Sequence, residues 1–237
     1  MGDVSVGPEV SGGARLDKWS RWTTLLLCGL IGLTVIALVS DGFEAKLLKD
    51  IGAGVYNGQP SLTGIAEDND ARQRAIGIVQ LCANALSFFV IGRWIYLANL
   101  GAREIGASGM AFTPGWSVGW YFVPFANLFK PFQAMREIWC ASVDPADWRS
   151  VAPPALLGWW WGLWIGSRVL GQVAYRLSQA ADGLDGALLA NAVTIASDLI
   201  NIPLCLVLVS IVSSIAGSQR AARARLQAAE GAVAFGR

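Results

Sequence analysis

The chain has 237 residues, of which 54% are hydrophobic and 15% are charged, and its net charge is +1. Since an average soluble domain has about 25% charged residues, this composition predicts an all-α integral membrane protein. The near-zero net charge argues against a nucleic-acid partner, which requires a concentrated basic surface. The sequence contains no histidine, which excludes histidine-based acid–base catalysis and histidine metal sites. We therefore expect no enzyme activity, no catalytic residues, no cofactor and no metal.

The N-terminal residues 1–21 predict a disordered cytoplasmic tail that carries Arg15, Lys18 and Arg21. An apolar run follows at residues 22–40. It is longer than the core of a signal peptide, which has about 7–15 residues, and no convincing cleavage site comes after it. We therefore expect this run to be retained as the first membrane span.

Three further apolar segments have the length of a spanning helix, at about residues 75–97, 155–177 and 191–215. The C-terminal tail, residues 216–237, is rich in alanine and arginine, and the turn at 178–190 has acidic residues but neither Lys nor Arg. Basic segments mark the cytoplasmic side, so both termini are expected there and the number of spans must be even. The sequence predicts four transmembrane helices within residues 22–215 of a multi-pass protein of the cell (plasma or inner) membrane.

Residues 112–139, between the second and third spans, are aromatic and apolar but contain three prolines. A proline inside a helix costs roughly 3 kcal/mol, and lipid tolerates broken backbone only where protein covers it. We expect a re-entrant or interfacial segment on the cytoplasmic side, in which the Asn127 side chain satisfies freed backbone groups. After Pro131, Met135 and Ile138 predict a short helix lying in the membrane interface. The residues that define the segment are Pro114, Trp116, Trp120, Pro124, Asn127, Lys130 and Pro131.

The run from Pro114 to Trp139 resembles the signature of a bacterial multi-pass membrane family, the domain of unknown function 4328. The resemblance covers roughly residues 75–215, including the tryptophan triplet at 159–161. It implies a helical membrane domain and assigns neither an activity nor a site.

Two ionisable residues, Arg168 and Asp198, fall at the same expected depth in the third and fourth spans. A charge at the centre of a span costs about 2.5–3.5 kcal/mol on insertion scales, so we expect the two to pair. The predicted intramembrane polar cluster consists of Arg168, Asp198, Asn201 and Gln172, with Asn191, Thr194, Gln80 and Asn84 as additions. Such a cluster either fixes helix register or lines a small polar cavity.

Gly158, Gly162 and Gly166 recur every four residues in the third span. This spacing predicts a surface on which another helix packs closely, from the same chain or from a second copy.

Two functions remain open from the sequence. The first is a non-enzymatic membrane protein that lies in the lipid bilayer and binds a protein partner or lipid through the aromatic segment. A second copy of the chain, in a homo-oligomer, is one candidate for the protein partner. The second is a small transporter or channel that uses the intramembrane Arg/Asp cluster.

Overall fold

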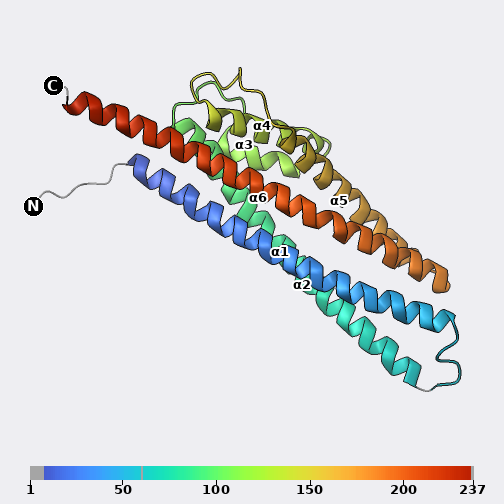
Figure 1. The fold of residues 1–237 in the computed structure, drawn as a ribbon. Helices are drawn as coiled ribbons and strands as arrows, with labels where there is room; N and C mark the ends of the chain where they lie inside the picture. The colour runs from blue at the N-terminus through green and yellow to red at the C-terminus, as the bar shows by residue number, and fades with distance from the viewer. Residues whose placement is uncertain (1–7, 60, 236–237) are drawn as a thin grey trace, which may run out of the picture. The chain divides into compact units, whose positions relative to one another are not determined.

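The computed structural model of the protein describes residues 8–59 and 61–235. Within these ranges the regular structure is helical (Figure 1). The elements in chain order are α1 (Pro8–Gly52), α2 (Ser61–Glu104), α3 (Pro114–Gly119), η1 (Trp120–Phe122), η2 (Ala126–Leu128), α4 (Lys130–Val143), α5 (Ala155–Ala180) and α6 (Gly183–Phe235). The all-helical part of the predicted fold class is therefore confirmed.

Within the described residues, three helices are long and apolar enough to cross a membrane: α1, α2 and α6. Helix α1 has 45 residues, and at about 1.5 Å per residue it is more than twice as long as the roughly 30 Å hydrocarbon core is thick. Each predicted span in these helices is therefore only the apolar part of a longer helix. The third predicted span, residues 155–177, forms the 26-residue α5, but α5 is not among the described helices with this apolar character.

The predicted tails also differ from the structure. Residues 8–21 belong to α1 rather than to a disordered tail, and Leu16 is buried, because this helix has an inward side that packs in the protein. Residues 1–7 lie outside the described part of the chain. At the other end, α6 continues to residue 235, and Gln219, which lies in the predicted basic C-terminal tail, is fully buried.

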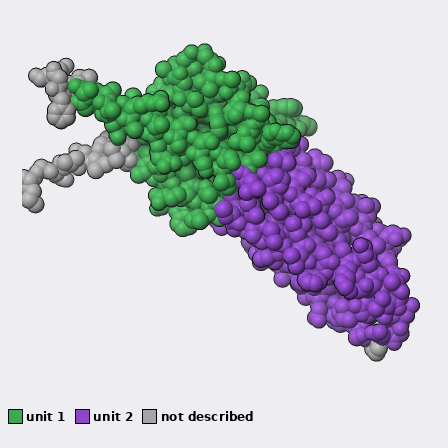
Figure 2. All heavy atoms as spheres, viewed as in Figure 1, with its two compact units in different colours: residues 1–26, 87–161, 207–237 green, residues 27–86, 162–206 purple. Residues whose placement is uncertain are grey.

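The described chain divides into two compact units, which Figure 2 shows in different colours. Unit 1 consists of residues 1–26, 87–161 and 207–237, and unit 2 consists of residues 27–86 and 162–206. Unit 1 therefore contains the proline-broken segment, whereas unit 2 contains the predicted intramembrane cluster.

The core of unit 1 is built from large apolar side chains of α2, α4 and α6. Trp94, Ile138 and Ile211 are each 0% exposed, and Met135 is 1% exposed. The Trp94 indole N–H donates to the Ser20 hydroxyl at 3.0 Å, so its burial leaves no polar atom unpaired. The expectation that Met135 and Ile138 face the membrane interface is wrong, because α4 turns this side into the protein core.

The buried positions of unit 2 are mostly small or polar, whereas many of its large apolar side chains are exposed. Leu81 is 72% exposed and Ile36 is 59% exposed, and none of the most apolar stretch of α2 is buried inside the protein. A water-soluble domain rarely exposes so much contiguous apolar surface. The exposed apolar surface of unit 2 is suited to contact with lipid.

The three regularly spaced glycines of α5 have no close neighbour among the described residues. A Cβ atom built on Gly158, Gly162 or Gly166 would meet no described atom within 4 Å. The structure therefore gives no packing partner for these glycines among the described residues, because regular spacing of small residues indicates a smooth surface without specifying its neighbour. The alternative, packing against a second copy, stays a prediction.

Candidate functional site

The proline-broken segment folds into α3, η1, η2 and α4 of unit 1, and its prolines occupy positions where no backbone donor is needed. Pro114 begins α3 directly after the cap residue Thr113, whose hydroxyl accepts from the Trp116 N–H at 3.3 Å. Pro131 lies in the first turn of α4. Proline suits the first turn of a helix because the N–H there has no helical partner. Pro114 and Pro131 therefore lie where new helices begin, so the predicted breaks in the backbone coincide with the N-termini of α3 and α4.

Pro124 leads into the most strained point of this backbone. Phe125 has φ 62° and ψ −44°, and the Ala126 N–H donates to the Pro124 carbonyl at 2.7 Å. These are the features of a classic γ-turn, which is rare and strained. A bulky residue with such a φ costs about 1–3 kcal/mol, and the Phe125 side chain is 84% exposed, so the strain places an aromatic ring on the surface.

Two charged side chains clamp the backbone that enters the segment. The Glu137 carboxylate of α4 accepts from the N–H groups of Ala111 and Phe112, each at 2.9 Å. Arg103 of α2 donates to the carbonyls of Met110 at 3.3 Å and Phe112 at 2.8 Å. The carboxylate therefore satisfies the donors and the guanidinium satisfies the acceptors of the same few residues, and we call this arrangement the Arg103/Glu137 clamp.

A second set of bonds holds the rest of the segment. Asn99 donates to the Phe112 carbonyl and to the Ser117 hydroxyl, both at 2.9 Å. The Trp161 indole N–H donates to the Leu128 carbonyl at 3.1 Å. Asn127 does not have the predicted role: its backbone N–H bonds the Val123 carbonyl at 2.9 Å, and its side chain bonds no described residue. Turns of the segment and side chains of the neighbouring helices satisfy the freed groups instead.

Several aromatic side chains of the proline-broken segment are exposed at its surface. Trp116 and Trp120 have ring centroids 4.8 Å apart, and the Lys130 ammonium lies 5.9 Å from the Trp120 ring, within the range of a cation–π contact. Trp116, Phe122 and Phe129 are 52%, 68% and 63% exposed. We call the four exposed rings the aromatic surface, and its members are Trp116, Phe122, Phe125 and Phe129.

The aromatic surface is continuous with α2 inside unit 1. Phe88 of α2 packs edge-on against Phe122, with ring centroids 5.0 Å apart. Phe88 and its neighbour Phe89 are themselves 41% and 75% exposed. Because α2 is apolar enough to cross a membrane, the exposed rings of the segment extend a surface of the kind that lipid covers.

Unit 2 holds a polar network that links α1, α2 and α6. Gln73 of α2 donates to the Asp41 carboxylate at 3.2 Å and to the Glu44 carboxylate at 2.6 Å. Asn191 of α6 donates to the Asp41 carbonyl at 3.2 Å and to the Glu44 carboxylate at 3.0 Å. Arg72 adds a bond to the Ser40 hydroxyl at 2.9 Å. Oδ2 of Asp41 is buried and has no hydrogen-bond partner among the described residues.

The predicted cluster is brought together only in part. Gln80 of α2 donates to the Asp198 carboxylate at 3.4 Å, and Asn201 also reaches this carboxylate. Arg168 and Gln172 are exposed, and the ion pairs between described side chains, Lys46–Asp50, Asp17–Arg220 and Glu104–Arg223, do not include Arg168. The expected Arg168–Asp198 pair is wrong because equal depth does not fix which side of each helix faces the other.

Sequence reasoning missed most of the partners in both sites. Asp41, Glu44 and Gln73 lie between the first and second predicted spans and were not included in the candidate sites, although two carboxylates three residues apart directly after an apolar run favour one inward helix side. Glu137 and Arg103 carried no signal beyond being charged residues near an apolar segment. Within the described ranges, no group of three or more metal-ligating side chains comes together.

Comparison with known proteins gives one match. The family model described as Domain of unknown function (DUF4328) matches residues 59–217. This range includes the whole aromatic segment with its clamp and the α2 and α6 sides of the polar network. No curated protein and no solved structure matches the chain.

Proposed function

The chain belongs to the family of the domain of unknown function DUF4328, and on that premise we propose that it is a non-enzymatic integral membrane protein that binds the lipid bilayer through the aromatic surface. The observation that carries this proposal is the strained γ-turn that exposes Phe125, three residues after the exposed Phe122, whose ring packs against Phe88 of α2. Burying one phenylalanine side chain gains about 1.5–3 kcal/mol. Lipid therefore offsets the cost of the turn.

The experiment measures where residue 125 lies in a reconstituted membrane. Phe125→Cys, in a background in which Cys28 and Cys82 are replaced by serine, is spin-labelled in lipid nanodiscs, and its accessibility to oxygen and to a water-soluble nickel complex is compared. The matched control is a label at Ser108, which is exposed in the loop before the segment. We expect the label at 125 to be oxygen-accessible and protected from nickel, and the label at 108 to show the reverse.

The other two outcomes contradict the proposal. Nickel accessibility at 125 equal to that at 108 places the ring in water. Protection from both reagents at 125 indicates contact with protein, and would make a protein partner or a second copy of the chain the better explanation.

We further propose that α5 crosses the membrane together with α1, α2 and α6, so that both termini and the aromatic segment lie on the cytoplasmic side of a cell membrane. Its 26 residues span about 39 Å, enough for the roughly 30 Å core. Three crossings would place the termini on opposite sides. Topology reporters fused to either end, with a third inserted at residues 181–182, distinguish the two arrangements: we expect both ends inside and the insertion outside.

A second candidate function is ion or solute passage through unit 2. It is favoured by the polar network, in which one buried oxygen of the Asp41 carboxylate has no partner in the described part of the chain. In proteoliposomes, Asp198→Asn is then expected to abolish a measurable flux while the exposed Asp182→Asn control leaves it unchanged. Equal flux in both variants removes this candidate.

A further inference from the structure

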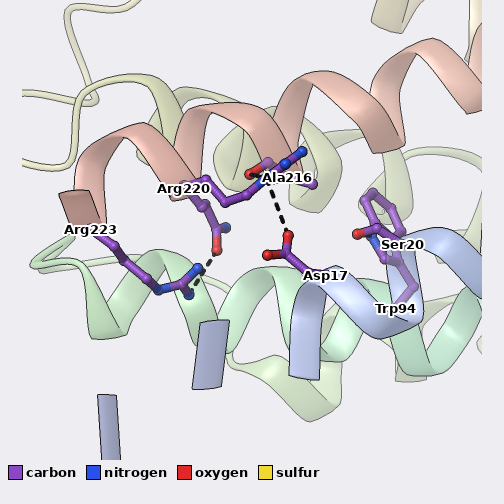
Figure 3. A network of polar contacts seen from close by, with 7 residues as sticks. Asp17, Ser20, Trp94, Ala216, Arg220 and Arg223 are labelled. Carbon is purple, nitrogen blue, oxygen red and sulfur yellow. Dashed lines mark hydrogen bonds and ion pairs between the residues drawn. The ribbon is translucent and has the colours of Figure 1, made fainter. Parts of the chain in front are cut away.

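A groove of about 560 Å³ lies between α1 and α6 of unit 1. It does not involve the aromatic surface. The α1 side contributes Asp17, Ser20, Arg21, Thr24 and Leu25, and the α6 side contributes Val212, Ser213, Ala216 and Arg220. Figure 3 shows part of this region, with the Asp17 carboxylate of α1 directed at Arg220 of α6.

The lining of the groove changes character along its length. Asp17, Arg21 and Arg220 lie at one end, just outside the apolar runs of their helices, whereas Leu25 and Val212 lie within those runs. A site with charge at the membrane surface and apolar side chains toward the interior matches a molecule with a charged head and a hydrocarbon tail. Basic pockets between membrane helices on the cytoplasmic side are suited to anionic lipid head groups.

The charged end has more donors than the protein itself uses. The Nε of Arg220 donates to the Ala216 carbonyl at 3.3 Å and lies 3.3 Å from the Asp17 carboxylate. Among the described residues, the hydrogen bond and the ion pair of Arg220 are made by this nitrogen, and none of the ion pairs between described side chains includes Arg21. Two guanidinium groups and one carboxylate therefore line the charged end of the groove, and a guanidinium group can bind a phosphate in a bidentate manner.

A neighbouring cavity of about 290 Å³ shares Asp17 and Arg220 with the groove and adds Arg223. One terminal nitrogen of Arg223 lies 3.6 Å from the Glu104 carboxylate. The other, Nη1, is buried with no hydrogen-bond partner among the described residues. An unpaired buried guanidinium nitrogen is costly, and an anionic acceptor at this end of the groove would lie close to it.

We propose that the groove binds one anionic phospholipid, with its phosphate between Arg21 and Arg220 and an acyl chain along Leu25 and Val212. The charge of the two arginines selects anionic over zwitterionic head groups. The apolar end distinguishes a lipid from free phosphate, which shares only the head-group chemistry.

The test measures lipid binding to the detergent-solubilised full chain by native mass spectrometry. Phosphatidylglycerol is titrated against phosphatidylcholine with the same acyl chains, for the wild type and for Arg21→Gln, Arg220→Gln and Arg225→Gln. Each arginine near the surface contributes about 1 kcal/mol toward anionic lipid, so each groove variant is expected to weaken phosphatidylglycerol binding about fivefold. The Arg225→Gln control changes an exposed arginine of α6 outside the groove and is expected to leave binding unchanged.

A further variant separates a binding role from a structural one. Asp17→Asn removes the carboxylate that occupies Arg220, so the proposal predicts tighter phosphatidylglycerol binding with a normal thermal unfolding curve. If the Asp17–Arg220 pair only joined the helices, this variant would weaken binding through loss of structure.

Three results would overturn the proposal. The first is equal binding of the two lipids by the wild type. The second is an equal effect of Arg225→Gln and Arg21→Gln. The third is displacement of bound phosphatidylglycerol by inorganic phosphate at comparable concentration, which would make the charged end a phosphate site without a lipid chain.

Discussion

The substitution Glu137→Gln tests the Arg103/Glu137 clamp directly. In the structure both carboxylate oxygens accept a backbone N–H, one from Ala111 and one from Phe112, each at 2.9 Å, and Glu137 is 7% exposed. Glutamine retains one acceptor and turns an NH₂ group toward the other N–H. A lost bond to a charged acceptor, together with a donor left unpaired in the interior, costs roughly 3 kcal/mol.

The assay is thermal unfolding in detergent, followed by tryptophan fluorescence. For a chain of this size, about 3 kcal/mol lowers Tm by about 6–12 °C. Glu137→Ala removes both acceptors and is expected to lower Tm further. The matched control Glu67→Gln changes an exposed glutamate of α2 and is expected to shift Tm by less than about 2 °C, since surface changes stay within about 0.5 kcal/mol. A Glu137→Gln protein that melts together with Glu67→Gln would refute the clamp.

Three further predictions concern the segment and its surroundings. Phe125 has φ 62°, a conformation that glycine adopts without strain. The Phe125→Gly protein is therefore expected to be more stable than the Phe125→Ala protein by about 1 kcal/mol, or about 2–4 °C in Tm. A higher Tm for Phe125→Ala contradicts the γ-turn. Trp161→Phe removes the hydrogen bond from the indole to the backbone of η2 and is expected to speed amide hydrogen exchange in η2 about fivefold. The control Trp159→Phe changes an exposed position and is expected to leave exchange in η2 unchanged. Equal exchange rates in the two variants argue against the hydrogen bond. Burial raises the pKa of the Cys140 thiol, and the thiolate is the form that reacts with maleimide. A variant in which Cys140 is the single cysteine should therefore react more slowly at pH 7 than the unfolded chain, and its rate should increase as the pH rises above about 8.5. Equal rates of the folded and unfolded variant at pH 7 contradict this prediction.

The helical class and the position of the broken segment could be predicted because both depend on local properties. Apolar runs of spanning length and prolines at intervals are visible in any single stretch of sequence, and α3 and α4 do begin at or beside Pro114 and Pro131. The predicted helix ends were wrong because they too were inferred from local properties alone. Residues 41–52 are polar enough to suggest a loop, yet they continue α1 because Asp41 and Glu44 find partners on α2 and α6.

The polar partners could not be predicted, because they depend on how each helix is rotated about its axis. Asp198 was recognised as a buried carboxylate, but its partner is Gln80 rather than Arg168. A sequence fixes the depth of a residue in a span through simple counting, whereas the direction of its side chain depends on packing against helices far away in the chain. Glu137 and Gln219 were missed for the same reason.

The burial of Gln219 bears on how this chain can be cut for experiment. Its amide donates to the Ala98 carbonyl at 2.8 Å and to the Ser142 hydroxyl at 2.9 Å, joining α6 to α2 and α4. The family model ends at residue 217 and begins at residue 59, so a recombinant fragment trimmed to those limits would lose Gln219 and also Ser20, the partner of Trp94. The stretch by which relatives are recognised is thus shorter than the stretch that folds, and expression should start before α1 and run past residue 219.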